Sequence, residues 1–393
     1  MKKQQKRIVI ISFAVILIMV AALAAFLMLE DQEERKAASS DTTEHTEDTG
    51  RQMPPPNSLK EERNEENQKT PESNTEPEKT PSTDATIDMV FMGDIYLSDY
   101  VLNQYKEKGI SGVLSEELLT QTKNADLAMA NEEFGFSTRG EPQADKQFTF
   151  RVNPSYVSVF QDMGLDIVSL ANNHSLDFGA EALSDSFATL DQAGILYAGA
   201  GDSKERSLRA MKIDANGKKI GILAATRVIP TADWNIDNRK PGLLCTYDGI
   251  ALCEAITEAK EHFDFVVVYV HWGVEKAEKP QDYQKDLARA YIDAGADLVV
   301  GAHPHVLQGI EYYKGKPIVY SLGNFIFYQE IEATVLLHIS MEADGNTMLR
   351  LIPATASGAL TKEAEGEAAK RILAHMRDIS FGVTINENGV VAE

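Results

Sequence analysis

Cysteine is scarce in this chain, whose 393 residues contain only Cys245 and Cys253. Two cysteines are too few for a zinc finger or for the disulfide framework of a small secreted domain. In an oxidising compartment the two could form a disulfide, and they could equally be two small apolar side chains. The length and a hydrophobic content of 43% allow a sizeable core, in one large domain or two smaller ones.

Basic residues are also few. The 38 lysines and arginines are outnumbered by 60 aspartates and glutamates, which gives a formal net charge of −22. Proteins that bind nucleic acid concentrate positive charge along the phosphates, and the one basic cluster here is Lys2, Lys3, Lys6 and Arg7. The composition therefore argues against a nucleic-acid partner.

Common nucleophile and nucleotide-binding motifs are missing. The sequence has no G-x-S-x-G and no Walker A pattern, and neither cysteine has a histidine nearby in the chain. If the protein is an enzyme, an activated water is the attacking group to expect.

One apolar run, IVIISFAVILIMVAALAAFLML at residues 8–29, is long enough to cross a bilayer of about 30 Å. Basic residues precede it and acidic ones follow it, which predicts residues 1–7 in the cytoplasm and the rest of the chain outside. The alternative is a signal peptide cleaved near Ala22-Leu23-Ala24. The length of the run favours a retained anchor, so we expect a single-pass protein of the cell membrane.

Residues 30–85 are rich in Glu, Thr, Ser, Asn and Pro and contain almost no large apolar side chains. Such a segment cannot bury enough apolar surface to offset the entropy lost on ordering. We therefore expect a disordered acidic stalk between the anchor and the folded part of the chain.

From Ile87 onward, short apolar runs alternate with amphipathic stretches, which is the pattern of an α/β fold. The runs predict strands within residues 86–94, 126–133, 165–174, 212–226, 263–273, 296–305 and 316–327. Helices are expected within residues 114–125, 155–164, 180–194, 248–262 and 281–294. We take 86–330 as the main domain, with further strands and a helix near 362–377 in residues 331–393 completing it. The apolar strands imply a sheet covered on both faces.

Polar residues that can bind a cation follow five of these strands. They are Asp94; Asn131 and Glu133; Asn172, Asn173 and His174; His271; and His303 with His305. Open α/β sheets bind ligands beyond the carboxyl ends of their strands, so separate loops would bring these groups to one crevice. A single histidine at a strand end is more often structural, but the repetition favours a polar active or binding crevice.

His303 and His305 flank Pro304 in the stretch GAHPHVLQG. Proline disfavours the helical region for the residue before it, so we expect an extended segment with both imidazoles on one side. Imidazole nitrogen together with carboxylate oxygen suits Zn²⁺, Mn²⁺ or Fe. The sequence therefore predicts one or two divalent metal ions at this crevice.

Three further residues are candidates for contact with a substrate. Arg151 has a planar set of donors suited to an anionic group, although an exposed arginine at a strand end explains it equally well. Glu275 could support the site or simply be solvated, and Asn324 could reach the crevice or belong to a tight turn at Gly323. His338 is expected to be a structural histidine of a sheet.

Several motifs resemble, in this order, the bacterial capsule-synthesis CapA family, also called PgsA, whose members act in poly-γ-glutamate synthesis and export. They are FMGDIYLSD, ANEEF, FTFRVNP, SLANNHSLDFGAEAL, VVVYVHWGVE, DAGADLVVGAHPHVLQG and IVYSLGNFIF. The resemblance covers about residues 86–330. It implies a calcineurin-like metallophosphoesterase fold, a β-sandwich flanked by helices, held outside the cell by an N-terminal anchor.

The resemblance also implies roles for the residues at the strand ends. Asp94 is similar to the first metal-binding aspartate of the phosphoesterases, and Asn131, or less readily Glu133, to the bridging ligand. Asn173 resembles a metal-binding asparagine and His174 the catalytic histidine beside it. His271, His303 and His305 resemble the remaining metal ligands.

Two departures from this pattern stand out. Tyr96 occupies the position of a metal-binding histidine, and Asn131 that of the bridging aspartate. Glu132 also stands where the family usually has an apolar residue. These departures favour one metal ion over two.

Three functional hypotheses remain open from the sequence. The leading one is a membrane-anchored extracellular protein for synthesis or export of an anionic polymer such as poly-γ-glutamate, with membrane-bound synthase subunits and the lipid bilayer as partners. The second is a metal-dependent hydrolase of phosphoesters or polymer amide bonds, with Asp94 and His174 in the catalytic site. The third is a polymer-binding module whose catalytic site is inactive.

Overall fold

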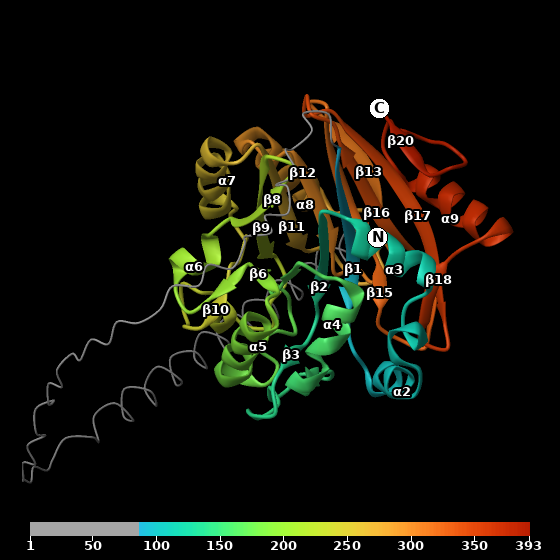
Figure 1. Ribbon diagram of the computed structural model, residues 1–393. Coiled ribbons are helices and arrows are strands. Elements are labelled where there is room, and N and C mark those ends of the chain that lie inside the picture. Colours follow the sequence, from blue (N-terminus) through green and yellow to red (C-terminus); the bar gives the residue numbers. More distant parts are fainter. Residues whose placement is uncertain (1–85) are drawn as a thin grey trace, which may run out of the picture. The chain divides into compact units, whose positions relative to one another are not determined.

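A computed structural model describes residues 86–393 of the chain (Figure 1). The predicted cytoplasmic segment 1–7, the anchor 8–29 and the stalk 30–85 lie outside the described residues. Within the described range, none of the helices has both the length and the apolar character needed to cross a membrane.

The first sheet has ten strands and combines parallel and antiparallel pairing. Its main order is β19-β20-β17-β16-β1-β2-β5-β6, with β15 joined to β1 and β18 joined to β17. Strands β1 (Ile87–Ile95), β2 (Leu127–Glu132), β5 (Ile167–Ser169) and β6 (Leu196–Ala198) pair in parallel, and β15 also pairs in parallel with β1. The others are β15 (Asn324–Ile326), β16 (Glu330–Met341), β17 (Thr347–Ser357), β18 (Leu360–Glu363), β19 (Thr384–Ile385) and β20 (Val390–Ala392). Strand β16 pairs directly with β1, so residues beyond 330 extend the sheet that begins at residue 87.

The second sheet has six strands in the order β13-β14-β12-β11-β9-β8. They are β8 (Met211–Ala215), β9 (Lys218–Thr226), β11 (Phe265–His271), β12 (Leu298–Ala302), β13 (Leu307–Tyr313) and β14 (Lys316–Leu322). A hairpin turn at Asn216-Gly217 joins β8 to β9, and both turn residues have positive φ (46° and 80°), as the tightest hairpin turns require.

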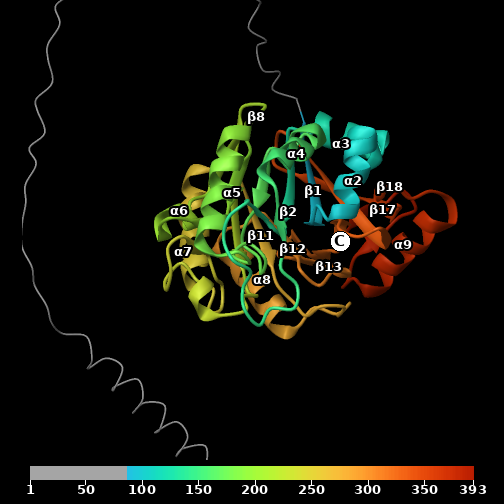
Figure 2. The same cartoon turned by 90° about the horizontal axis from the view of Figure 1, so that it is seen from below.

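The two sheets pack face to face with helices on their outer faces, in four layers. Alternate residues of the central strands enter a shared core between the sheets, including Met129 and Val267, while their neighbours Ala128 and Val268 face helices. Figure 2 shows α4, the pair β1 and β2, the pair β11 and β12, and α8 in succession. This arrangement is the reason for the near-continuous apolar strands, because both faces of each sheet are buried.

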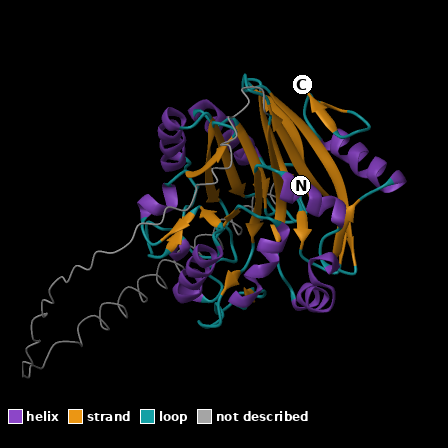
Figure 3. Ribbon diagram, viewed as in Figure 1, coloured by secondary structure: helices purple, strands orange, loops and turns teal. Residues whose placement is uncertain are grey.

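Apart from α2, the helices of the outer layers follow their expected positions closely. The first sheet is covered by α2 (Asp99–Lys108), α3 (Glu116–Asn124), α4 (Ser158–Met163) and α5 (Gly179–Ala193). The second is covered by α7 (Ile250–His262) and α8 (Asp282–Ala294). Helix α9 (Gly366–Ile379) packs on β13 and β17 at the end of the shared core. Figure 3 shows the strands at the centre and the helices around them.

Two local expectations differ from the structure. The strand expected over 165–174 ends at Ser169, and the rest of that stretch forms turns that carry the site residues described below. Helix α2 was not predicted, because its sequence DYVLNQYKEK is mostly polar and buries only Val101 and Leu102. Cys245 and Cys253 are free thiols, so the structure has no disulfide between them.

Candidate metal centre

The carboxyl ends of strands from both sheets meet at one place. Asp94 at the end of β1 and Asn131 at the end of β2 lie in register, and the Asn131 Nδ2 donates to Asp94 Oδ1 at 2.8 Å. The same nitrogen lies 3.3 Å from Nδ1 of His271, which ends β11 in the second sheet. All three side chains are completely buried. The crevice expected from the sequence thus lies where the two sheets meet.

The turn after β5 joins this group through two asparagines. Asn172 Nδ2 donates to Asn131 Oδ1 at 3.1 Å and to the Glu132 carbonyl at 2.7 Å. Asn173 Oδ1 lies 2.7 Å from His271 Nε2. The side chain of Asn172 therefore fixes the turn, while that of Asn173 reaches across to the second sheet.

The His303–His305 segment is not extended, contrary to the expectation from Pro304. His303 has φ of 98° and His305 has φ of 58°, so both lie in the region that side chains other than glycine rarely adopt. The backbone N–H of His303 donates to Asp94 Oδ2 at 3.2 Å, which holds the turn in place. Backbone conformations of this kind cost roughly 1–3 kcal/mol each and concentrate at functional sites. The turn still brings the two imidazoles together, with ring centroids 5.8 Å apart.

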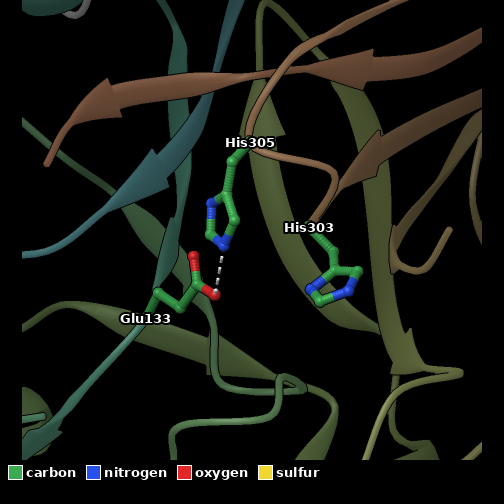
Figure 4. A group of neighbouring side chains, drawn as sticks. All are labelled: Glu133, His303 and His305. Atoms are coloured by element: carbon green, nitrogen blue, oxygen red, sulfur yellow. Dashed lines mark ion pairs between the residues drawn. The ribbon is translucent and has the colours of Figure 1, made fainter. Parts of the chain in front are cut away.

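Glu133, His303 and His305 form a group in which one ligand atom from each residue lies within 4.8 Å of the others. Figure 4 shows the Glu133 carboxylate facing His305, with His303 beside them. Glu133 Oε1 is 3.9 Å from His305 Nε2 and 3.7 Å from His271 Nε2. These distances are too long for hydrogen bonds and leave room for a small ion.

Polar atoms of this group are buried without partners. Both Glu133 carboxylate oxygens and His303 Nδ1 have no hydrogen-bond partner among the described residues, and Glu133 is fully buried. Buried polar groups are normally paired, because an unpaired one costs about 1–3 kcal/mol. A divalent cation would satisfy all three atoms at once, and the mixed nitrogen and oxygen donors fit Zn²⁺, Mn²⁺ or Fe. The residues present therefore fit a metal ion.

The electrostatics around His305 also favour a positive charge. Burial, and then the charge of Asp94, raises the pKa of Glu133 well above its usual value. Burial lowers the pKa of His305, but Glu133 and Asp94 outweigh it and raise that pKa to about 9. Burial, followed by the charge of His305, lowers the pKa of His303 to about 3, so its imidazole is neutral. A neutral His303 with a free Nδ1 is in the state required of a metal ligand.

The four other predicted metal ligands, Asp94, Asn131, Asn173 and His271, have their donor atoms engaged. Both Asp94 oxygens accept hydrogen bonds, and Asn131 uses its amide nitrogen and its carbonyl oxygen within the site. His271 is hydrogen-bonded through both ring nitrogens, one of them to Asn173. Of the two alternatives for the bridging position, Glu133 offers a free carboxylate and Asn131 does not. In these contacts Asp94, Asn131, Asn173 and His271 bond to one another and to the turns, whereas Glu133, His303 and His305 form the group that could hold an ion.

His174 lies at the margin of the group and is tightly oriented. Its Nδ1 is 2.6 Å from Asp177 Oδ2, and its ring stacks on Phe150 with centroids 4.1 Å apart. A carboxylate only accepts hydrogen bonds, so Nδ1 carries the proton and Nε2 is left free. Burial lowers the pKa of His174, although Asp177 acts in the opposite direction. Asp177 was not among the residues predicted from the sequence. The available signal was its position three residues after His174.

Tyr96 belongs to an aromatic group. Its ring stacks on Phe150 at 3.9 Å between centroids, and Phe150 lies between Tyr96 and His174. Phe327 contacts Phe150 at 5.8 Å and His305 at 5.1 Å between centroids. At the position where the family resemblance implied a histidine, Tyr96 thus supports the ring that stacks on His174.

The three candidate substrate residues have different surroundings. Asn324 belongs to the site, since its Oδ1 lies 2.8 Å from His305 Nδ1. Glu275 is exposed, and its charge contributes to the raised pKa of Glu133, after burial and Asp94. A cavity of about 290 Å³ gives access from this side, lined by His305 and Asn324 together with Tyr328, Glu278, Glu330 and Glu332 among others.

The placement of Arg151 differs from the prediction that it binds an anion in the crevice. Its guanidinium donates to the carbonyls of Arg139 and Gly140 and lies 4.0 Å from the Phe178 ring centroid, and the residue is exposed. These contacts agree with the alternative given for Arg151, that of an exposed arginine at the end of a strand. His338 is structural as expected, with Nε2 2.8 Å from Asp88 Oδ1.

Comparison with known proteins gives matches over most of the described range. Residues 88–329 match the family model described as bacterial capsule synthesis protein PGA_cap. "PGA biosynthesis protein CapA" of Bacillus subtilis (strain 168) is 34% identical over 255 residues, covering 64% of this chain and 66% of that protein. "Capsule biosynthesis protein CapA" of Bacillus anthracis is 31% identical over 275 residues, covering 67% of this chain and 66% of that protein. The match thus spans just under two thirds of each relative.

Among solved structures, a hypothetical protein from Thermus thermophilus aligns with a TM-score of 0.43 and 17% identity. The alignment covers 68% of this chain and 98% of that one.

Proposed function

We propose that this chain, which belongs to the bacterial capsule synthesis protein PGA_cap family, acts in the synthesis or export of an anionic capsular polymer. Poly-γ-glutamate is the polymer that we propose. The family expected from the sequence motifs is confirmed by the match over residues 88–329. Its two Bacillus relatives are named for PGA biosynthesis and for capsule biosynthesis, which supports this polymer as the ligand.

The observation that carries the proposal is the set of unpaired buried atoms on Glu133 and His303, beside His305. A metal ion held by these three residues would supply the positive charge that a protein of net charge −22 needs in order to hold an anionic group. The remaining residues orient this set: Asp94 holds the His303 backbone, and Asn324 holds the His305 ring. The four-layer sandwich with this site at its strand ends supports a calcineurin-like metallophosphoesterase fold.

We further propose that residues 8–29 anchor the protein in the cell membrane, with residues 86–393 outside the cell. The support is the uncharged run of 22 residues, with basic residues before it and acidic residues after it. In this position the site would meet the polymer outside the membrane, and membrane-bound synthase subunits would be its neighbours.

A second candidate function, metal-dependent hydrolysis of a phosphoester or a polymer amide bond, is favoured by the orientation of His174. Its free Nε2, with Asp177 on the other nitrogen, is arranged to exchange a proton with a bound group. Burial by Phe150 and the neighbouring side chains limits access of water to the ring. Phe150 and Asp177 would thus keep His174 in one orientation during such a reaction.

The role in polymer production is tested by complementation of a strain from which the gene has been deleted. We expect the wild-type chain to restore surface polymer and His303→Ala to reduce it at least about tenfold, because that substitution removes one of three ligands. His338→Ala is the matched control and should restore polymer fully, since His338 bonds to Asp88 away from the site. Surface polymer is measured by its glutamate content after acid hydrolysis, with equal protein amounts verified by immunoblot.

Two outcomes would decide against parts of this proposal. Normal polymer in the deletion strain would contradict the role in the cell. Full restoration by His303→Ala would show that the metal centre is not needed for it. Restoration by His174→Ala but not by His303→Ala would favour a binding function over hydrolysis.

A further inference from the structure

A lysine that the sequence did not identify lies inside the site. Lys146 belongs to the loop between β3 (Gly135–Phe136) and β4 (Arg151–Val152), and its side chain is only 14% exposed. Its ammonium group donates to the Asn173 carbonyl and to Asp177 Oδ1, and it lies 3.1 Å from His174 Nδ1. The Trp234 ring centroid is 5.2 Å away. Such burial of a lysine is costly, and it lowers the pKa of Lys146 in spite of Asp177.

A count of hydrogen bonds leaves one donor of Lys146 unused. An ammonium group has three N–H bonds, and two of them go to the Asn173 carbonyl and to Asp177. His174 Nδ1 donates its own proton to Asp177 Oδ2, so this nitrogen cannot also accept a bond from Lys146. The third N–H of Lys146 therefore has no acceptor within residues 86–393 and is free for a ligand beside His174.

Lys146, like His305, is a cation whose charge reaches the rest of the site. Burial dominates the pKa shifts of Glu133, His174, His271 and His303, and Lys146 contributes to each of them, whereas no arginine does. The cavity beside His305 is lined by three glutamates, Glu278, Glu330 and Glu332, together with Lys276, His305 and His375. Lys146, rather than the candidate Arg151, thus brings a basic side chain close to His174.

We propose that Lys146 is an anion-binding residue of this site, and that its free N–H binds one carboxylate oxygen of the polymer next to His174. This inference rests on the proposed function, because it takes poly-γ-glutamate as the ligand. A single free donor suits contact with one oxygen of a carboxylate, and a two-pronged contact such as arginine makes is not available. The two contacts to Asn173 and Asp177 fix the ammonium group, so little flexibility is lost when the carboxylate binds.

The test compares two probes by isothermal titration calorimetry on the full chain in detergent with Zn²⁺ present. One probe is a γ-linked glutamate oligomer, and the other is the same oligomer with its α-carboxylates converted to carboxamides. We expect the wild-type chain to prefer the carboxylate oligomer. In Lys146→Gln the affinity for it should fall about tenfold or more, the effect of losing one buried charge-assisted hydrogen bond, and the preference should disappear.

Two further variants separate charge from folding. Lys146→Arg keeps the positive charge and should retain a preference for the carboxylate oligomer even if Lys146→Gln folds poorly. Lys370→Gln removes an exposed lysine on α9 that pairs with Glu367, and it should bind both oligomers as the wild type does. A purely structural role for Lys146 would instead lower the melting temperature and weaken binding of both oligomers equally.

The outcomes distinguish this inference from the proposed function. If the wild-type chain binds neither oligomer, the proposed function fails and this inference fails with it. If the wild-type chain binds the carboxylate oligomer and Lys146→Gln binds it equally well, only the role of Lys146 is overturned. If Lys146→Arg, like Lys146→Gln, loses the preference for the carboxylate oligomer, a role of the positive charge of Lys146 is contradicted.

Discussion

Replacing Glu133 with methionine is expected to lower the affinity for Zn²⁺ at least about a hundredfold and to stabilise the metal-free protein at the same time. The affinity falls because the substitution removes a direct ligand, and loss of a mere supporting contact already costs roughly 10- to 100-fold. The metal-free protein gains stability because the substitution removes two carboxylate oxygens that are buried without a partner among the described residues. Removing such a group relieves about 1–3 kcal/mol, and methionine is similar in size. Metal affinity is measured by competition with a chelating dye, and the free energy of unfolding by urea denaturation.

The chain contains a closely matched control for this experiment in the preceding residue. Glu132 is also fully buried, and neither of its carboxylate oxygens has a partner within residues 86–393. Successive residues of a strand point to opposite faces, and burial alone raises the pKa of Glu132, with no contribution from the histidines. Glu132→Met should therefore stabilise the protein to a similar extent and leave Zn²⁺ affinity unchanged. If both variants lose Zn²⁺ affinity equally, or if neither loses it, the assignment of Glu133 as a metal ligand is contradicted.

The convergence of the site could be predicted because strands have a simple physical signature. An apolar run buried on both faces must end where it reaches solvent, and in parallel strands those ends share an edge. Asp94 and His271 follow such runs in different sheets, and the structure places their side chains 3.9 Å apart. The topology that joins two sheets was not readable from the runs themselves, and it entered the sequence analysis only through the family resemblance.

The choice between Asn131 and Glu133 could not be made in the same way. Family resemblance put Asn131 at the bridging position, and spacing alone leaves both residues at the end of β2. Hydrogen bonding distinguishes them and supports Glu133, because Asn131 is engaged with Asp94 and Asn172, while the Glu133 carboxylate bonds to none of the described residues. Such competition for partners depends on side chains from distant segments, which no local pattern contains.

Lys146 and Arg151 illustrate the limits of assignment from a local sequence. Both lie near β4, and Arg151 stood in a motif whereas Lys146 stood in a polar loop with no periodicity. The arginine bonds to nearby carbonyls, and the lysine crosses to Asn173 and Asp177. The direction of the loop decides which cation enters the site, and that direction depends on Asp177 accepting the Phe150 backbone N–H at 2.7 Å.

Removal of metal ions by a chelator is expected to lower the melting temperature of the wild-type protein by several degrees. A ligand that binds only the folded state at about 100 times its Kd adds about 2.7 kcal/mol to stability, and removing the ion takes this away. His303→Ala should show almost no difference between metal-loaded and chelated samples, since its imidazole supplies one of the three ligand atoms. His338→Ala, whose bond to Asp88 lies outside the site, should keep the full difference.

This second measurement is independent of any polymer and of any reaction, so it tests the metal centre alone. Differential scanning calorimetry with added Zn²⁺ or Mn²⁺ gives the temperature shift, and equilibrium dialysis gives the number of ions bound. One ion per chain is expected, because Tyr96 is stacked on Phe150 and the oxygens of Asp94 are hydrogen-bonded. Two ions per chain would require Asp94 and Asn131 to give up these bonds, and would contradict the single-ion assignment. An unchanged melting temperature with no bound ion would contradict a metal centre at Glu133, His303 and His305.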